Sequence, residues 1–259
     1  MPTLDIFRLS HESLQQITNR RSDIIQQWQH YWRTRTVDEV VCRYTKGSVR
    51  SVTIVDEEYP DRFRYLSDPP PVLYVSGNEH LLNCTRTLAV VGTRSPSEYG
   101  KARLNELLVP VVQQNTVIVS GLARGIDTLA HKLAIGNNGK TIAVIGSGHN
   151  HIYPKENQGL AKTISQNHLL LSEYPPDVVP QKWHFPERNR LISALGDLLF
   201  VVEAGERSGT LITVDCALEQ GKDVCALPGN VGVSTSVGTN RLIQQGAKMV
   251  LTVDDLIPS

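Results

Sequence analysis

Residues 87–121 read TLAVVGTRSPSEYGKARLNELLVPVVQQNTVIVSG, and this stretch decides the fold. It begins and ends with short, almost wholly apolar runs, TLAVVG (87–92) and TVIVSG (116–121), which are typical of strands covered on both faces of a sheet. Between them lies the helix-length segment SEYGKARLNELLVPVVQQ. A strand, a helix and a second strand of this kind predict a βαβ unit with parallel strands.

The same alternation continues along the rest of the chain. Helix-length segments such as LARGIDTLAHKLAIG and SGTLITVDCALEQG separate further apolar runs. We therefore expect the α/β class, with a Rossmann-like, mostly parallel and doubly wound sheet. The further runs are TIAVIG (141–146), HLLLSE (168–173), DLLFVVEA (197–204), DVCALPG (223–229) and KMVLTV (248–253).

The pattern before residue 87 is different. Residues 1–45 predict a small helical domain, with Ser10 as a helix N-cap and with apolar residues at Ile17, Ile24, Ile25 and Trp28. Residues 46–86 are predicted to be a connecting or extension segment. This segment contains the β-rich RSVTIVD and a Pro-rich stretch, DPPPVLYVSGN, that leads into a short strand. Residues 87–259 then make up the Rossmann-like domain.

The composition excludes several classes of protein. With 40% apolar and 20% charged residues the chain can fill a core, and no apolar run approaches the length of a membrane span. The N-terminus lacks the layout of a secretion signal. The four cysteines are scattered, which predicts free thiols in a reducing cytoplasm and no metal site. They are Cys42, Cys84, Cys216 and Cys225.

The charge is distributed unevenly, although the formal net charge is zero. Residues 195–259 carry four Lys or Arg against eight Asp or Glu, so the preceding part of the chain is net positive. A polyanionic partner therefore requires a local basic patch, and we expect that patch outside the acidic C-terminal part.

The stretch AIGNNGKTIAVIGSG, residues 134–148, contains a Gly-Lys-Thr that matches part of an ATP-binding P-loop. A P-loop leaves a strand and enters a helix, whose N-terminus then faces the phosphates. Here the order is reversed, because a helix ends in GNNG and Lys140 and Thr141 begin a strand. We therefore expect a helix–strand turn. Gly146 and Gly148 do follow a strand, but His151 stands where a dinucleotide fingerprint has its third glycine, so the case for NAD is weak.

Glycines, hydroxyl residues and basic residues gather directly after the predicted strands. Ligands of open α/β sheets bind at this carboxyl edge, where helix N-termini contribute partial positive charge and Arg offers a fork for phosphate. In any single loop, glycine and serine are better explained as turn and cap residues. Because such loops recur at one edge, we infer an anion site for a phosphodiester or nucleotide. The contributing segments are 92–96, 120–127, 146–148, 153–155, 182–190, 203–210 and 228–230.

Aromatic residues accompany the basic ones in the segment 182–190, which the sequence predicts to be a long connection. Trp183, His184 and Phe185 offer stacking surfaces for bases, although aromatic residues in a row are also common in cores. The sequence contains neither a GxSxG nor an HExxH motif, so no nucleophile constellation is predicted. His131 is expected to pack a helix, and Asp127 to interact with the dipole of that helix.

An ordered set of motifs resembles the DNA-processing protein A family, DprA, also called Smf. The resemblance implies a Rossmann-like domain that binds single-stranded DNA, works as a homodimer, protects incoming strands in natural transformation and loads RecA recombinase onto them. It implies neither a catalysed reaction nor a cofactor. The motifs are VVGTRSPSEYG, SGLARGIDTLAH, TIAVIGSG followed by IYP, LLSEYPP, HFPERNRLISAL, VVEAGERSGTLIT, GKDVCALPG and GTNRLIQQGA.

The resemblance also implies which residues contact the strand. Arg94, Lys182 and Arg188 are expected to hold backbone phosphates, and the loops at 120–121 and 208–210 to donate N–H and hydroxyl groups. The full set is Gly92, Thr93, Arg94, Ser120, Gly121, Arg124, Lys155, Lys182, Arg188, Asn189, Arg190, Ser208, Gly209 and Thr210. Many members add a C-terminal winged-helix domain, whereas this chain ends soon after the last predicted strand, so functions of that domain are not expected of it.

Two other functions would use the same edge of the sheet. A phosphoribohydrolase of the lysine-decarboxylase-like type carries PGGxGTxxE, whereas the comparable GERSGTLIT has Thr213 in place of the glutamate. A mononucleotide sensor would use the pocket without DNA. Binding measurements distinguish the sensor, because it should bind one nucleotide as tightly as a long strand.

Overall fold

The computed structural model describes residues 10–18, 21–34 and 49–257. Contacts between residues divide the chain into two units, residues 1–47 and 48–259, and each is described by itself. The predicted domain boundaries at 45/46 and 86/87 stay a prediction. Among the described residues, no helix is both long enough and apolar enough to cross a membrane.

The N-terminal unit contains two described helices, α1 (His11–Thr18) and α2 (Ser22–Thr34). The Ser10 hydroxyl accepts a hydrogen bond from the Ser13 N–H at 3.1 Å, so Ser10 is the N-cap predicted from the sequence. Leu14 and Ile25 are fully buried. In the predicted helical domain, residues 1–9 and 35–45 lie outside the described residues. The side chains of Ile17 and Trp28 lie outside the described side chains.

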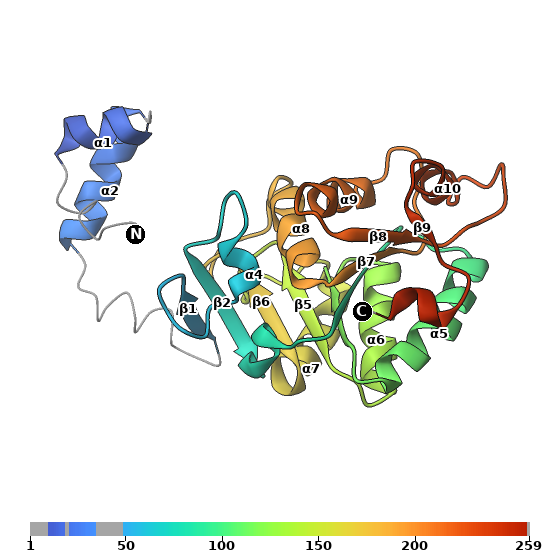
Figure 1. The fold of residues 1–259 in the computed structure, drawn as a ribbon. Coiled ribbons are helices and arrows are strands. Elements are labelled where there is room, and N and C mark those ends of the chain that lie inside the picture. Colours follow the sequence, from blue (N-terminus) through green and yellow to red (C-terminus); the bar gives the residue numbers. More distant parts are fainter. Residues whose placement is uncertain (1–9, 19–20, 35–48, 258–259) are drawn as a thin grey trace. The chain divides into compact units, whose positions relative to one another are not determined.

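The second unit is built on one nine-stranded sheet with the order β1-β2-β6-β5-β4-β3-β7-β8-β9 (Figure 1). In this order, every pair of neighbours in the run β6-β5-β4-β3-β7-β8-β9 is parallel. Strands β2 and β1 extend the sheet beyond β6 by antiparallel pairing. All seven predicted apolar runs form strands, which confirms the Rossmann-like, mostly parallel α/β sheet. The strands are β1 (Arg50–Thr53), β2 (Val72–Gly77), β3 (Thr87–Val91), β4 (Val117–Ser120), β5 (Thr141–Ile145), β6 (Leu169–Ser172), β7 (Leu198–Val201), β8 (Asp223–Ala226) and β9 (Lys248–Met249).

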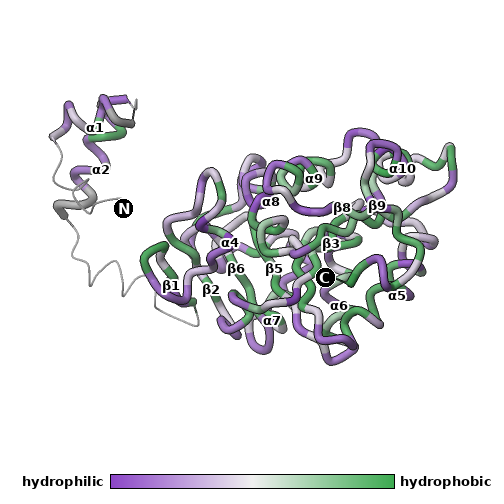
Figure 2. Tube along the Cα trace, viewed as in Figure 1, coloured by the Kyte–Doolittle hydropathy of each residue, from purple (hydrophilic) through white to green (hydrophobic). Residues whose placement is uncertain are grey.

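Helices connect the strands of this unit. The α-helices are α4 (Asp61–Arg64), α5 (Glu98–Gln113), α6 (Ile126–Gly136), α7 (Gln158–Asn167), α8 (His184–Leu195), α9 (Thr210–Glu219) and α10 (Val237–Gln244). Short 3-10 helices are η2 (Glu79–Asn83), η3 (Lys155–Asn157) and η4 (Val253–Leu256). In the hydropathy colours of Figure 2, hydrophobic residues concentrate along the central strands.

The two faces of the sheet bury different residues of the same strands. In β3, Ala89 belongs to a cluster with side chains of α4, α8, α9 and α10, whereas Leu88 belongs to a cluster with side chains of α5 and α6. Helix α7 packs on the second face against β5 and β6. This alternation follows from the two-residue period of a strand and explains why the predicted runs are almost wholly apolar.

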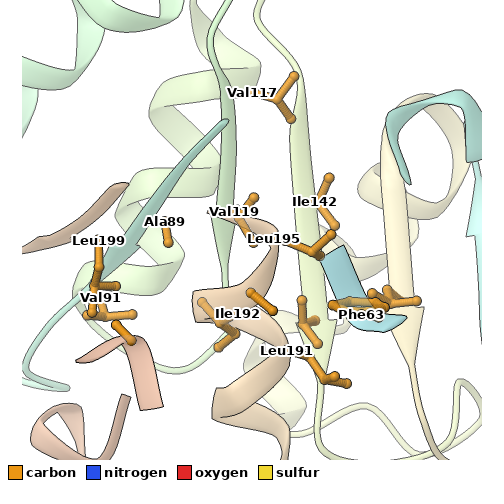
Figure 3. Close-up of a cluster of buried hydrophobic side chains, with 14 of the residues drawn as sticks. Phe63, Ala89, Val91, Val117, Val119, Ile142, Leu191, Ile192, Leu195 and Leu199 are labelled. Carbon is orange, nitrogen blue, oxygen red and sulfur yellow. The ribbon is translucent and has the colours of Figure 1, made fainter. Parts of the chain in front are cut away.

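Helix α8 corrects one sequence expectation. The connection predicted over 182–190 is wrong from His184 onward, because α8 begins there. Pro186 in the first turn is tolerated, since the first N–H groups of a helix have no partner within it. The later residues Leu191, Ile192 and Leu195 pack over the sheet (Figure 3), and this tertiary packing stabilises the helix.

The Gly-Lys-Thr stretch forms the helix–strand turn that the sequence predicts. The Gly139 N–H donates to Ala134 O at 2.8 Å at the end of α6, and Asn138 has a φ of 58°. Strand β5 begins at Thr141, so the residues after Lys140 form a strand. The order of elements is opposite to that of a P-loop.

The chain order of the sheet reverses between neighbouring strands β3 and β7. From β3 the chain continues through β4, β5 and β6 on one side, and from β7 through β8 and β9 on the other. At such a switch point, the loops at the carboxyl ends of the two strands diverge and leave a crevice in which ligands commonly bind.

His131 of α6 is expected to couple stability to pH. The side chain is fully buried, and its Nδ1 lies 2.7 Å from the Thr141 hydroxyl, which donates to Ile118 O. Burial lowers the pKa of His131 to about 3 from 6.5. Below pH 6.5 the unfolded chain therefore binds a proton that the folded protein does not. The free energy of unfolding consequently decreases as the pH is lowered, by about 1.4 kcal/mol per pH unit for this residue.

Urea unfolding near neutral pH and near pH 5 measures this effect. In a His131→Gln variant, the loss of stability between the two conditions is expected to be smaller by about 2 kcal/mol. His149, whose pKa burial lowers to about 4, keeps its own contribution in that variant. An unchanged pH dependence after His131→Gln would contradict the assignment.

Candidate nucleic-acid interface

The loops after β3 and β4 touch each other at the carboxyl edge of the sheet. The Ile126 N–H donates to Thr93 O at 3.2 Å. Gly125 has a φ of 75°, and a Cβ added there would lie 2.3 Å from Thr93 O, so this close approach requires glycine. The contact brings Thr93 and Arg94 of the GTR motif beside the second predicted loop.

Arg94, Lys155 and Lys182 are exposed cations of this edge, and within the described part of the chain none of their side chains forms a hydrogen bond or an ion pair. Lys155 opens η3 after β5, and Lys182 precedes α8. Such cations can bind a phosphate without first breaking an internal pair. Arg124 differs, because its Nε and Nη2 donate to the Glu156 carboxylate at 2.5 and 2.8 Å.

Arg188 does not belong to this exposed group, since it is only 5% exposed. Its Nη1 donates to Gly121 O at 2.6 Å and also to Val144 O. The guanidinium thus joins the loop after β4 to strand β5. Burial lowers the pKa of Arg188 to about 10, against the opposing effect of Asp127. This placement argues against the direct contact with a phosphate that the resemblance implies for Arg188, because the side chain faces the protein interior.

Asp127 supplies the negative charge near Arg188. Its Oδ2 accepts hydrogen bonds from the N–H groups of Gly121 and Ala123, at 3.1 and 3.3 Å. Burial raises the pKa of Asp127, while Arg188 and these two N–H groups act in the opposite direction. A Cβ on Gly121 would lie 2.7 Å from both Arg188 Nη1 and Asp127 Oδ2. Glycine at 121 therefore makes room for this buried pair of charges.

Arg188 and Arg190 lie on nearly opposite sides of helix α8. Successive helical residues are rotated by about 100°, so two residues in positions i and i+2 lie on nearly opposite sides. Arg190 Nη2 donates to Glu173 Oε1 at 2.6 Å, and both side chains are largely buried. Asn189 Oδ1 accepts from Arg188 Nε at 3.2 Å. The structure thus ties Arg190 to the residue after β6, and not to the loops after β3 and β4.

Ser120 and Gly92 serve the packing of the sheet. The Ser120 hydroxyl is fully buried and donates to Val90 O at 2.6 Å. This bond corrects the expectation that the hydroxyl would bond to DNA. A Cβ on Gly92 would lie 2.6 Å from Ile126 Cγ1, so this position allows helix α6 to approach β3 closely.

Ser208, Gly209 and Thr210 lie after β7, at the beginning of α9. The Ser208 hydroxyl accepts from the Thr210 N–H at 3.2 Å and donates to the Thr210 hydroxyl at 2.9 Å. The Ser208 hydroxyl is thus bonded to both the N–H and the hydroxyl of Thr210, while the N-cap of α9 is Gly209. Gly209 is exposed, and its surroundings leave open space at the position of a Cβ.

Aromatic side chains surround the beginning of α8. Trp183 is 60% exposed and Tyr153 45% exposed, and the rings of Tyr153 and Phe185 are 5.5 Å apart. His184 is buried, and its ring stacks on Tyr174 at 3.9 Å. Of the three aromatic residues predicted to stack on bases, Trp183 thus offers the most open ring, whereas His184 is already stacked inside the protein.

Sequence reasoning assigned no role to Tyr174. Its hydroxyl donates to Glu187 Oε2 at 2.6 Å, and burial together with this carboxylate raises its pKa. The side chain therefore connects the segment after β6 to the first turn of α8. The motif LLSEYPP contains this residue, but only the tertiary contact with Glu187 shows what it does.

The sequence model of the family described as DNA recombination-mediator protein A matches residues 50–259. The chain belongs to this family. The resemblance to DprA/Smf proteins that the motifs indicate is thereby confirmed.

Curated DprA proteins are similar to the chain over most of its length. DprA of Bacillus subtilis (strain 168) is 44% identical over 217 residues, which cover 84% of this chain and 73% of that protein. DprA of Streptococcus pneumoniae is 46% identical over 207 residues, which cover 80% and 73%.

Solved DprA structures share the fold. The X-ray structure of DprA from Streptococcus pneumoniae has a TM-score of 0.85 at 40% identity, covering 95% of this chain and 85% of that chain. A DprA structure from Helicobacter pylori has a TM-score of 0.74 at 32% identity, covering 81% and 94%. That study concerns the single-stranded DNA binding mode of the Helicobacter protein.

Proposed function

We propose that this chain binds single-stranded DNA at the carboxyl edge of its sheet, protecting the strand and presenting it to RecA recombinase in natural transformation and homologous recombination. The observation that carries the proposal is a group of exposed cations, Arg94, Lys155 and Lys182, whose side chains have no partner in the part of the chain that the structure describes. The exposed rings of Trp183 and Tyr153 accompany them. Membership of the DprA family and the single-stranded DNA binding of the Helicobacter relative support it.

Single strands suit an edge of this kind better than duplexes do. Cations distributed over several loops can follow a flexible backbone, and unstacked bases can lie on open aromatic rings. Lys182 and Trp183 are adjacent in the chain, so a phosphate contact and a base contact fall next to each other. In a duplex the bases are paired and stacked inside the double helix, so they cannot stack on Trp183.

Within this proposal the residues have different roles. Arg94, Lys155 and Lys182 contact phosphates directly, and the exposed Gly209 brings backbone close to the strand. Arg188 is a positioning residue, because its guanidinium holds the loop after β4 from inside. Arg124 can bind a phosphate only after its ion pair with Glu156 breaks, so its contribution to the affinity for DNA is smaller.

We infer a binding role without catalysis. Asp127 and Glu203, two carboxylates of this edge, are buried and accept hydrogen bonds from the protein itself. Glu156 is paired with Arg124. Thr213, at the position of the phosphoribohydrolase glutamate, is buried in α9. These contacts favour structural roles for the residues concerned over proton transfer to a substrate.

Fluorescence anisotropy of labelled oligo-dT across a salt series tests the proposal. We expect tight binding at low salt and a log K against log salt slope of about −0.7 per phosphate contact, which is about −2 for three cations. Unlabelled duplex should compete poorly. Absence of binding at low salt would defeat the DNA function. Competition by one mononucleotide as strong as by the oligonucleotide would indicate a sensor, and release of a free base would indicate the phosphoribohydrolase.

We propose that the homodimer and the contact with RecA use the acidic C-terminal part of the sheet, and not the carboxyl edge. Near the edge strand β9, Val231, Met249 and Leu251 are 97, 42 and 65% exposed. Exposed apolar side chains of this kind favour a protein partner. Sedimentation of a Leu251→Glu variant beside the wild type tests the dimer, which the added charge should weaken.

We place this function in the cytoplasm. Cys84, Cys216 and Cys225 are free thiols, and Cys42 lies outside the described residues. Free thiols in the described part of the chain fit a reducing compartment.

A further inference from the structure

The switch point between β3 and β7 is next to the beginning of helix α5. The first N–H groups of a helix carry partial positive charge, and in doubly wound sheets this position commonly holds a ligand phosphate. Here the loop 92–97 leads from β3 into α5, and Ser97 is the N-cap, whose hydroxyl accepts from the Gly100 N–H at 3.1 Å.

A carboxylate of the protein occupies this position. Glu203 follows β7 and is 2% exposed. Its Oε2 accepts from the Ser97 N–H at 2.8 Å, and its Oε1 accepts from the Ser97 hydroxyl at 2.6 Å and the Thr235 hydroxyl at 2.8 Å. Within the described residues no Lys, Arg or His forms an ion pair with it, so these donors and the helix N-terminus compensate the buried charge.

The surroundings fit this carboxylate closely. A Cβ on Gly100 would lie 2.2 Å from Glu203 Oε2, so the helix admits the carboxylate only because residue 100 is glycine. The main chain of Glu203 also takes part, because its carbonyl accepts from the Thr93 N–H at 2.8 Å. Both ends of the loop that carries Arg94 are therefore attached to one residue.

We propose that Glu203 is an internal anion that takes the place of a ligand phosphate at the switch point. The carboxylate accepts the hydrogen bonds of the N–H and the hydroxyl of Ser97, the N-cap of α5, and repels a second anion. The switch point is therefore closed to inorganic phosphate and to free mononucleotides. Arg94 remains outside the closed crevice, on a loop held at both ends. Glu203 thereby determines specificity, favouring a strand bound along the edge over a single nucleotide bound in the crevice. This last consequence rests on the proposed function, whereas the closing of the crevice does not.

Replacement of Glu203 by alanine should create a vacancy that a small carboxylate can fill. Thermal unfolding is measured in sodium acetate and in sodium chloride at equal ionic strength. We expect Glu203→Ala to have a lower Tm than the wild type in chloride, and acetate to raise the Tm of the variant by several degrees while leaving the wild type unchanged. Glu203→Gln is the matched control, because its side chain keeps the volume and leaves no vacancy for acetate.

The inference is overturned if Glu203→Ala unfolds at the same temperature in both salts, or if Glu203→Gln responds to acetate equally. A second measurement uses the wild type alone, in case the alanine variant does not fold. The amide resonances of Ser97 and Gly100 should not shift when inorganic phosphate is added, and a saturable shift of both would show that the crevice is open.

The two proposals fail in different experiments. If the wild type does not bind oligo-dT but acetate rescues Glu203→Ala, the DNA function is wrong and the internal anion stands. If the wild type binds oligo-dT and acetate has no specific effect on Glu203→Ala, the DNA function stands and the role of Glu203 is wrong.

Discussion

Replacement of Arg188 by alanine is expected to lower the free energy of unfolding by about 3–5 kcal/mol, the range for loss of one partner from a buried pair of charges. The guanidinium is 5% exposed and donates to Gly121 O and Val144 O. Its removal leaves two carbonyls without these donors and takes from the buried Asp127 carboxyl the cation that acts on it most strongly. Both effects act on the loop after β4, so this loop should open before the rest of the sheet.

Urea unfolding measures the loss, with Arg103→Ala as the control. Arg103 is an exposed residue of α5 that, among the residues the structure describes, pairs only with Glu106 of the same helix. Its replacement should change stability by no more than about 0.5 kcal/mol. If Arg188→Ala keeps wild-type stability and loses affinity for oligo-dT, Arg188 contacts a phosphate directly and its positioning role is wrong.

Replacement of Arg94 by alanine is expected to weaken binding of oligo-dT by about 10–100-fold, since a charge-assisted contact with phosphate contributes about 1.5–3 kcal/mol. Arg94 is exposed and is unpaired among the described residues, so its loss removes a contact with DNA and none within the protein. Stability should therefore stay within about 0.5 kcal/mol of the wild type. The salt slope should become less steep by about 0.7.

Arg86→Ala is the matched control for this experiment. Arg86 is also exposed and immediately precedes β3, at the opposite end of the strand that leads to Arg94. Its replacement should leave affinity and salt slope unchanged if DNA binds at the carboxyl edge. Equal losses from Arg86→Ala and Arg94→Ala would indicate diffuse electrostatic binding and contradict a defined site.

The strands, and the edge at which their loops meet, could be predicted because both depend on local pattern. A strand covered on both faces is apolar throughout, as in TLAVVG and TIAVIG, so it can be recognised without its neighbours. Parallel strands end at one edge, so the residues after them, such as Arg94 and Gly121, had to share that edge. Helix α8 was missed because its first turn contains Pro186 and because its stability depends on packing over the sheet.

The α/β class, the parallel direction of the main strands and the family follow from the sequence alone, which also predicts the edge proposed to bind DNA. Only the tertiary structure decided which polar side chains at that edge are free to bind. Arg188 is held by a carbonyl of the loop after β4 and a carbonyl of β5, Arg190 by Glu173, and the Ser120 hydroxyl by Val90. Arg94, by contrast, has no partner for its side chain among the described residues. The physical reason is that exposure and hydrogen bonding depend on partners from distant segments, and no local period or motif encodes those partners.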